Sequence, residues 1–289
     1  VRREERPGPA ILPLFAWSRL GGAIRTLQSS FPFIYGGALP AHAAAAALPG
    51  LLESPGGRLA SWRISGNPFA PADPAVDRAL TERGFVRGED STWLLELPAR
   101  EEDYWEKTLT AAKRNDVRRL GRKGVVVEES RRPEDVDGVY RHYLASFARW
   151  GGRPRFVYPV RFYRNLLQLG GPAVRLTVAR HEGRLLGGAF TLRWNGKAHY
   201  LAGYFDHESR ALRPNVLIQI DSILQGIRDG LRWYDFLPSG GHASVVEFKE
   251  GLGGRRAPFP VWTRTGPLHR MLGGRREPRR TLPPPPAAP

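Results

Sequence analysis

Lysine is the rarer cation in this chain, and the lysine at position 249 is the residue whose type is best suited to chemistry. Only five of the 44 lysine and arginine residues are lysines, so a compact ammonium group is kept at few positions. A point cation of this kind stabilises negative charge that develops on a reacting oxygen, or the phosphate of a donor. The alternative interpretation is an exposed loop lysine between Glu247 and Glu250.

Several well-defined chemical motifs are absent from the sequence. The lack of cysteine excludes disulfides, thiolate metal sites and a cysteine nucleophile. There is no GxxxxGK[ST] loop, no GxGxxG after a strand, and no HExxH, GxSxG or EF-hand loop. The seven histidines are scattered without the spacing of paired ligands, so surface or hydrogen-bonded roles are favoured. We expect no metal, flavin or nicotinamide.

The positive charge of the chain is concentrated in one short run. The net charge is +16, and six of the eleven residues from Lys113 to Lys123 are cations. Such a balance attracts anions, including nucleic acid. However, arginine in excess of lysine, together with abundant alanine, glycine and proline, is also what a GC-rich coding sequence produces. The charge alone therefore does not establish a nucleic-acid partner.

No membrane span is expected, because no apolar stretch approaches the roughly 20 residues that a bilayer requires. The opening VRREERPGPAILPLF lacks the long apolar segment of a signal peptide. The expected compartment is the cytoplasm.

The middle of the chain carries the clearest secondary-structure signals. Alternating apolar residues predict three strands, and Asn195-Gly196 between the second and third is typical of a type I′ hairpin turn. Apolar residues at helical spacing follow Pro214 and stop before Gly230. The predicted elements are an antiparallel meander (174–180, 185–194 and 198–206), a helix (214–229) and a buried strand (231–237).

A long helix is expected over 101–123, followed by helices over 133–150 and 159–169. The acidic start and basic end of the 101–123 helix match the helix dipole. One apolar stripe runs along it, formed by Trp105, Leu109, Ala112, Val117 and Leu120. The six cations occupy mostly the remaining circumference, so the simplest interpretation is a solvated helix face.

The first hundred residues give weaker signals of the same kind. Strands are expected in ILPLFAW, AIRTLQSSF, RLASWRI and STWLLEL, and helices in AHAAAAALPGLL and DPAVDRALTERGF. The chain is therefore expected to be α/β (α+β), with two halves joined by the long helix. The Arg/Pro-rich segment 272–289 is expected to be a disordered tail, since its proline run forms neither helix nor ladder.

Three stretches together resemble the FemAB-like acyltransferases of the GNAT superfamily. They are KRNDVRRLGRKGVVVEE, the segment from RLLGGAFTLRW to EFKEGLGG, and FPFIYGGALP. The match covers about residues 11–262, and order and spacing carry it rather than any one motif. The resemblance implies two GNAT-like halves, each a mixed, mainly antiparallel sheet flanked by helices. The halves are expected at 1–100 and 124–271, with the connecting helix at 101–123.

The chain departs from the family in two places. It begins close to AILPLFAW, without the helix and strand that precede this segment in the family, so we expect an N-terminally incomplete first half whose sheet lacks an edge partner. The pyrophosphate loop of ordinary GNAT enzymes (Q/R-x-x-G-x-G/A) is missing, and HESRALRPNVLI stands in its place. The second departure weakens acetyl-CoA as the expected donor.

The resemblance implies transfer of an acyl or aminoacyl group from a thioester or ester to an amine. Such chemistry requires positioning, a route for a proton and donors for an oxyanion. Lys249 is the expected catalytic residue, beside the donor carbonyl. Backbone N–H groups at the end of 200–205, where Gly203 permits close approach, are expected oxyanion contacts; a plain strand with a glycine is the alternative. Weaker candidates for binding substrate or donor are Tyr35, Arg118, Tyr163, Tyr204, Asn215 and Phe248, the aromatic ones alternatively being core residues.

The expected function is N-acyl transfer from acyl-CoA to a small molecule, an amino sugar or a cell-envelope or polysaccharide precursor. One alternative uses aminoacyl-tRNA as donor and a peptidoglycan precursor as acceptor; the charge favours it, and the absence of a long helical arm disfavours it. A non-catalytic basic module that binds nucleic acid is an alternative of another class, and an inactive relative is a further one. Coenzyme A, tRNA and nucleotide-linked sugars all carry phosphates, so the basic run does not choose among them.

Overall fold

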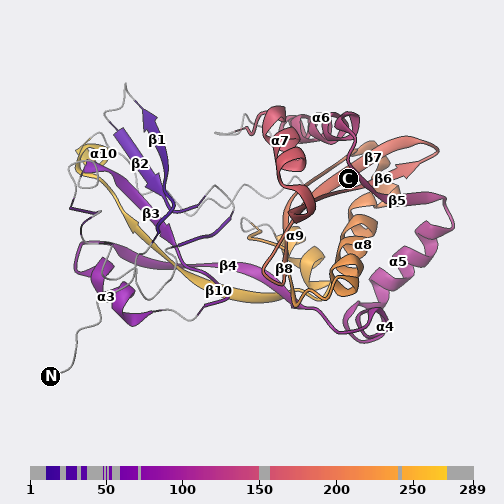
Figure 1. Ribbon diagram of the computed structural model, residues 1–289, viewed down its shortest axis with the longest axis horizontal. Coiled ribbons are helices and arrows are strands. Elements are labelled where there is room, and N and C mark those ends of the chain that lie inside the picture. Colours follow the sequence, from indigo (N-terminus) through magenta and orange to yellow (C-terminus); the bar gives the residue numbers. More distant parts are fainter. Residues whose placement is uncertain are drawn as a thin grey trace. The chain divides into compact units, whose positions relative to one another are not determined.

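A computed structural model describes residues 11–19, 24–30, 34–37, 48, 50, 52–53, 59–70, 73–149, 157–239 and 243–271. The chain divides into two compact units, shown in Figure 1. The first contains Val1–Thr92 with Arg256–Leu282, and the second contains Trp93–Leu237 with Ala243–Arg255. Strands β4 (Val86–Glu96) and β10 (Arg255–Arg264) each begin in one unit and end in the other.

Among the described residues of the first unit, strands follow one another in the order β1-β2-β3-β10, and the first part of β4 follows β10. The β1–β2 and β3–β10 pairs are antiparallel and the β2–β3 pair is parallel. Its remaining elements are β1 (Phe15–Arg19), β2 (Ile24–Gln28), β3 (Ser61–Ser65), α3 (Pro74–Thr81) and α10 (Pro267–Met271). Residues 261–264 fall within the range expected for the second half, yet they pair with residues 62–65 of β3 in the first unit. The chain before residue 11, most of the helix expected at 41–52, and the 272–289 tail lie outside the described residues.

Aromatic side chains make up much of the core of the first unit. Trp62, Phe85 and Trp262 are buried in one cluster with Leu80 of α3. The α3 helix begins where the sequence predicts, because the side chain of Asp73 accepts a hydrogen bond from the backbone N–H of Ala75. These contacts stabilise the first unit, where the secondary-structure signals of the sequence were weak.

The second unit contains a six-stranded mixed sheet in the order β4-β9-β8-β7-β6-β5. Adjacent strands are antiparallel except for β8 and β9. The predicted meander is confirmed, and Asn195 and Gly196 have the positive φ values of 47° and 70° that its turn requires. The strands of the unit besides β4 are β5 (Val125–Ser130), β6 (Val174–His181), β7 (Arg184–Trp194), β8 (Lys197–Phe205) and β9 (Trp233–Asp235).

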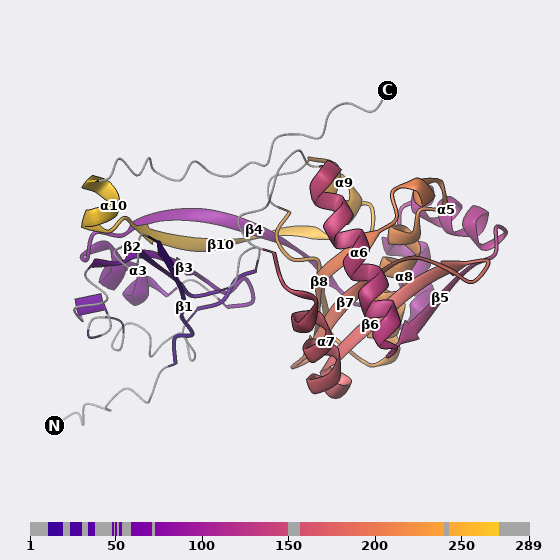
Figure 2. The same ribbon diagram turned by 90° about the horizontal axis from the view of Figure 1, so that it is seen from above.

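Helices cover both faces of this sheet, as Figures 1 and 2 show. Successive residues of a strand point to opposite faces: Leu176 and Val178 of β6 pack against α6 (Pro133–Arg149) and α7 (Val160–Leu169), and Ala179 packs with Ile218 of α8 (Pro214–Arg228). The three helices predicted from the sequence are thereby confirmed. Short 3₁₀ turns at Gly171–Ala173 and Glu208–Leu212 precede β6 and α8, and α9 (Ala243–Glu250) follows β9.

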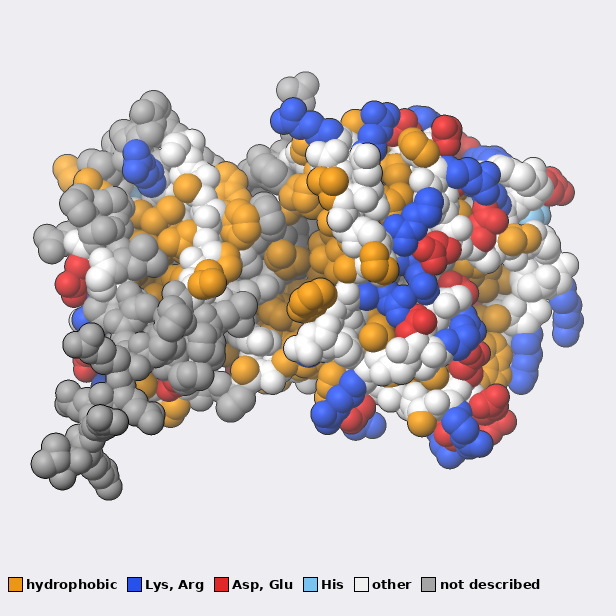
Figure 3. Space-filling view, viewed as in Figure 1, with side chains coloured by type: hydrophobic (Ala, Val, Ile, Leu, Met, Phe, Trp, Pro, Cys, Tyr) orange, Lys and Arg blue, Asp and Glu red, His pale blue; other side chains and the backbone are white. Residues whose placement is uncertain are grey.

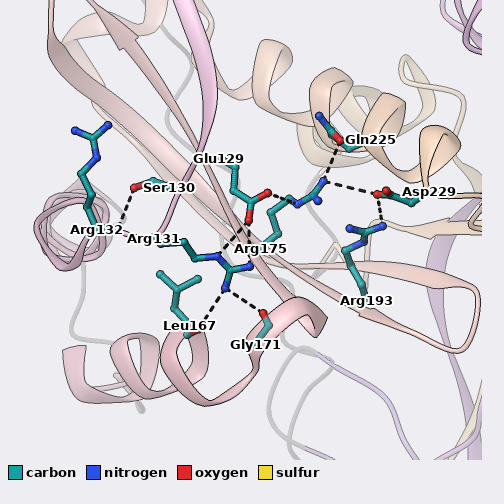
Figure 4. Close-up of polar contacts among 10 residues, drawn as sticks. All are labelled: Glu129, Ser130, Arg131, Arg132, Leu167, Gly171, Arg175, Arg193, Gln225 and Asp229. Atoms are coloured by element: carbon teal, nitrogen blue, oxygen red, sulfur yellow. Dashed lines mark hydrogen bonds and ion pairs between the residues drawn. The ribbon is translucent and has the colours of Figure 1, made fainter.

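Ion pairs attach the carboxyl-terminal end of α8 to the sheet (Figure 4). Arg175 of β6 lies with Nε 2.8 Å from Oε2 of Glu129 on β5, and its Nη1 donates to Oε1 of Gln225 on α8 at 3.2 Å. Arg193 of β7 pairs with Asp229, which directly follows α8. Because Arg175 is only 18% exposed at its side chain, this network is shielded from solvent more than a typical surface pair. The network holds the carboxyl-terminal end of α8, and the amino-terminal end of this helix follows β8.

The expectation of one long helix over 101–123 is wrong. The structure has α4 (Glu101–Asp103), a π-helical turn (Tyr104–Thr108), an extended step at Leu109 and Thr110, and α5 (Ala111–Gly121). The break buries Tyr104 and Leu109 together in the core, where the Tyr104 hydroxyl donates to the carbonyl of Leu252 at 3.2 Å. Arg114 then contacts the carbonyl oxygens left at the end of the first helix, those of Trp105, Glu106 and Leu109. One of the six cations is therefore a helix cap.

We expect Arg114→Ala to destabilise the protein by about 1–3 kcal/mol, because it leaves part-buried carbonyl groups without a charged donor. Urea unfolding of the variant should show a lower midpoint. Arg118→Ala is the matched control, since Arg118 lies exposed on the same helix. Equal midpoints for the two variants would contradict the capping role.

Candidate active site

Two parallel strands part at the centre of the second sheet. Strands β8 and β9 pair only from Lys197 to His199 and from Trp233 to Asp235. Beyond His199, β8 continues to Phe205, and the chain after Asp235 instead hydrogen-bonds β4 through Phe236 N–H and the Trp93 carbonyl, at 2.9 Å. A backbone edge of β8 is thereby left without β9 as its partner. Parted strands of this kind present backbone N–H groups that stabilise a developing oxyanion.

A β-bulge lies on β8 at the same point. Phe190 of β7 is opposite Ala202 and Thr191 is opposite Tyr200, so Leu201 is an extra residue. Bulges bend a strand and re-aim its side chains. Here the ring of Tyr200 lies over Gly203, where a Cβ atom would stand 2.1 Å from the tyrosine hydroxyl. The glycine is therefore explained by close packing of Tyr200, and a contact between its backbone and a ligand stays a proposal.

Lys249 lies in helix α9, not in an exposed loop. Its residue is 3% exposed, and its ammonium donates a hydrogen bond to the carbonyl of Leu237. The nitrogen lies 5.4 Å from the centroid of the Trp93 ring, at cation–π range. Burial lowers the pKa of Lys249 to about 7, against the opposing effect of the Asp235 charge. The side chain thus changes charge near neutral pH, as groups in active sites often do.

A tight turn after α9 is what allows this placement. The carbonyl of Lys249 accepts hydrogen bonds from the N–H groups of Leu252 and Gly254, at 3.1 and 2.9 Å. Gly253 has a φ of +93°, which residues with a Cβ rarely adopt. The sequence EFKEGLGG therefore ends the helix directly after the lysine.

Asp235 and His199 lie at the last pair of β8 and β9. The Asp235 carboxylate is fully buried, with Oδ2 2.8 Å from Nδ1 of His199 and Oδ1 accepting from Leu237 N–H at 2.9 Å. Sequence reasoning did not assign either residue to the site. A signal was present, however, because Asp235 is a charged residue within the apolar run WYDFL of a buried strand.

Two of the weaker candidates lie together in an aromatic cluster. The hydroxyls of Tyr163 on α7 and Tyr204 on β8 are 3.1 Å apart, and the Tyr204 ring stacks near Tyr143 with centroids separated by 4.3 Å. Burial raises the pKa of Tyr204 and of Tyr163 well above the ordinary value. Tyr163 is 2% exposed and is a core residue; any contact with substrate would come through Tyr204.

The other candidates are dispersed. Phe248 packs beside Lys113, whose nitrogen is 5.2 Å from the ring centroid. Asn215 lies in the first turn of α8, and Arg118 is exposed on α5. Tyr35 belongs to the first unit, where the centroid of its ring lies 5.2 Å from that of Phe259. Of the candidates in the second unit, Phe248 directly precedes Lys249 on α9.

The basic run is not one uniform solvated face. Lys113 packs on Phe248, Arg114 caps a helix, and Arg119 and Arg213 share the carboxylate of Asp116. On the face of the second unit shown in Figure 3, basic and acidic side chains are interspersed. Much of the positive charge on this face is therefore paired within the protein.

Among the described residues there is no group of three or more His, Cys, Asp and Glu side chains placed to hold a metal ion. Across the same residues, no helix combines the length and the apolar character needed to span a bilayer.

Comparison with known proteins gives a family match that lies mostly within the second unit. Residues 110–250 match the family described as "Acetyltransferase (GNAT) domain". No curated protein matches the chain in sequence. Among solved structures, FemX is 15% identical with a TM-score of 0.67, over 94% of this chain and 89% of its own.

Two further structures are similar to this chain. One is the C-terminal domain of a protein from Agrobacterium fabrum that is described as a lysylphosphatidylglycerol synthetase. It is 12% identical with a TM-score of 0.59, over 92% of this chain and 91% of its own. L-PGS from Bacillus licheniformis is 9% identical with a TM-score of 0.56, over 91% of this chain and 87% of its own. At these identities the likeness concerns the fold.

Residues 110–250 are therefore similar to GNAT acetyltransferases, and this match supports an acyltransferase. The fold of the chain is the FemAB-like GNAT fold that the sequence resemblance implied, and the predicted fold class is confirmed.

We expect Lys249→Met to stabilise the protein by about 1 kcal/mol or more below pH 7, because a buried charge is replaced by an apolar side chain of similar length. The folded-state pKa of about 7 lies below the unfolded value near 10.4, so the cost of burying the ammonium is fully present below pH 7. It declines as the pH rises from 7 toward 10. The difference in melting temperature between variant and wild type should shrink over that range, and a constant difference would show that Lys249 is not the group responsible.

Proposed function

We propose that this enzyme transfers an acyl group from an acyl thioester, with acyl-CoA as the donor class, to the amine of a small molecule, an amino sugar or a cell-envelope or polysaccharide precursor. The observation that carries the proposal is a buried lysine of lowered pKa beside the point where β8 and β9 part. The GNAT match over residues 110–250 supports the thioester as donor.

In the proposed reaction the amine nitrogen attacks the thioester carbonyl carbon, and the carbonyl oxygen becomes an oxyanion. The oxyanion re-forms the carbonyl as the carbon–sulfur bond breaks, and the proton that the nitrogen loses is taken up by the leaving thiolate, which departs as a thiol. Backbone N–H groups on the unpaired edge of β8 and the Lys249 ammonium stabilise the oxyanion. Because Lys249 is 3% exposed, its charge acts where water does not screen it, and such charges have their largest effect there.

Assignments of the other candidates form part of the same proposal. We place the acceptor near Tyr204 on β8, and the donor near Asn215, Arg118 and Phe248. Tyr35, in the first unit, stays a candidate for binding substrate or donor. The domain boundaries at 1–100, 101–123 and 124–271 likewise stay a proposal.

Aminoacyl-tRNA is the second candidate donor, and the similarity in fold to FemX favours it. The acceptor in that case is a peptidoglycan precursor. The bond broken is then a carbon–oxygen ester bond, while the attacking amine and the oxyanion are unchanged. The site described above would serve either donor, so the choice between them is experimental.

The donor class is tested by incubating the purified protein with acyl-CoAs or charged tRNAs and amine acceptors, followed by mass spectrometry. We expect an acylated acceptor with acyl-CoA and none with charged tRNA. Product from charged tRNA alone would replace the thioester proposal with the aminoacyl-tRNA one. Absence of product from both, together with binding of polyanions that weakens steeply with salt, would favour the nucleic-acid-binding alternative.

We expect Lys249→Met to lower kcat/KM for transfer by at least about 10-fold, or about 1.4 kcal/mol in the barrier, with the fold intact. The profile of kcat/KM against pH in the wild type should have a falling limb with an apparent pKa of about 7, since the ammonium loses its charge there. Lys123→Met, which removes an exposed lysine, is the matched control and should keep both the rate and the limb. A folded Lys249→Met variant with an unchanged rate would remove Lys249 from the mechanism.

A further inference from the structure

Asp235 is a fully buried carboxylate to which the proposed reaction gives no role. It is the last residue of β9, where pairing with β8 stops. Oδ2 of the carboxylate contacts Nδ1 of His199 on β8, and Oδ1 accepts a hydrogen bond from the Leu237 backbone N–H. Because an ionised carboxylate only accepts hydrogen bonds, the imidazole of His199 donates through Nδ1–H. A buried charge held in this way is costly to keep, so its position calls for a physical reason.

Leu237 connects Asp235 to Lys249. Its N–H donates to Asp235 Oδ1 at 2.9 Å, and its carbonyl accepts from the Lys249 ammonium. Its φ is +58°, a left-handed conformation that is strained for a residue with a Cβ atom. Strain of this kind persists only where surrounding contacts enforce it. The contacts here are the carboxylate on one side of the residue and the ammonium on the other.

The charges that face Lys249 come from few elements. Strand β9 contributes Asp235, with His199 of β8 on the far side of that carboxylate. Strand β4 contributes the ring of Trp93, whose indole N–H donates to Oε1 of Glu250 at 3.3 Å. Helix α5 places Lys113 over the ring of Phe248, the residue before Lys249. Burial lowers the pKa of Lys249, and the charge of Asp235 is what opposes this effect.

We propose that Asp235 is a positioning residue for Lys249: its carboxylate fixes the Leu237 turn, so that the Leu237 carbonyl receives the ammonium, and its negative charge favours the ammonium form of the lysine. His199 completes the hydrogen bonding of the carboxylate. The catalytic meaning of this arrangement rests on the proposed function, whereas its effect on Lys249 can be measured without any substrate.

The small number of lysines makes a direct measurement practical. In full-length protein labelled with ¹³C- and ¹⁵N-lysine, five side-chain signals are expected, and Lys249→Met identifies the one from Lys249. Asp235→Asn keeps the shape of the side chain and removes its charge. We expect the Lys249 signal to titrate at lower pH, with the acid dissociation constant raised about tenfold or more. Glu250→Gln, which removes a neighbouring charge from the same helix, is the matched control and should leave the titration unchanged.

A second pair of variants separates the charge from the turn. Leu237→Gly accepts the positive φ without strain and should leave the Lys249 titration close to that of the wild type. Asp235→Asn/Leu237→Gly keeps the turn accessible without the carboxylate, so it serves if Asp235→Asn alone does not fold. The Lys249 signal of this double variant should still titrate at a lower pH than that of the wild type. A folded variant without Asp235 that titrates like the wild type would overturn the proposal.

Kinetics then distinguish this inference from the proposed function. In Asp235→Asn the falling limb of kcat/KM should move to lower pH together with the Lys249 signal, an effect that general loss of structure does not produce. If the wild type transfers no acyl group from any donor, the proposed function fails, while the lysine titration still decides the role of Asp235. A shifted signal with an unshifted limb would retain the positioning contact and exclude Lys249 from the transfer step.

Discussion

An ammonium group leaves water only if the surrounding protein offers it acceptors and opposite charge, and the arrangement around Lys249 follows from this constraint. The carbonyl that receives the lysine belongs to Leu237, and it is presented by a backbone turn two residues after Asp235. Since the chain must turn there, β9 is only three residues long and cannot follow β8 further. The unpaired edge of β8, on which the proposed chemistry depends, is thus a consequence of how a buried lysine is accommodated.

Charge elsewhere in the second unit is also used internally. Arg175 joins β5, β6 and α8, and Arg114 closes the end of a helix. Because arginine offers five donors in a fixed planar arrangement, it can satisfy several carbonyl or carboxylate oxygens at once. The high positive charge of the chain is therefore an incomplete guide to its partners.

Much of the second unit was predictable from sequence, because local rules govern it. Asn195-Gly196 determines its hairpin, and alternating apolar residues determine the faces of β6. The break at Leu109 was not predictable, since apolar spacing continues across it and only burial against distant Leu252 favours it. For the same reason Lys249 could be singled out by its type, whereas its burial, the Leu237 turn and the contact of Asp235 with His199 come from pairings between distant residues. The bulge at Leu201 leaves no trace in the residue types.

The position of β10 has a consequence for how the protein is made. Ser65 of β3 pairs with Val261 of β10, so the sheet of the first unit lacks this strand until about 200 further residues have been synthesised. At roughly 5–20 residues per second, a ribosome takes on the order of ten seconds or more to cover that interval. Throughout this time the edge of β3 is open to pairing with other chains. The nascent polypeptide is thus exposed to aggregation at its amino-terminal end for as long as its carboxyl-terminal end is being translated.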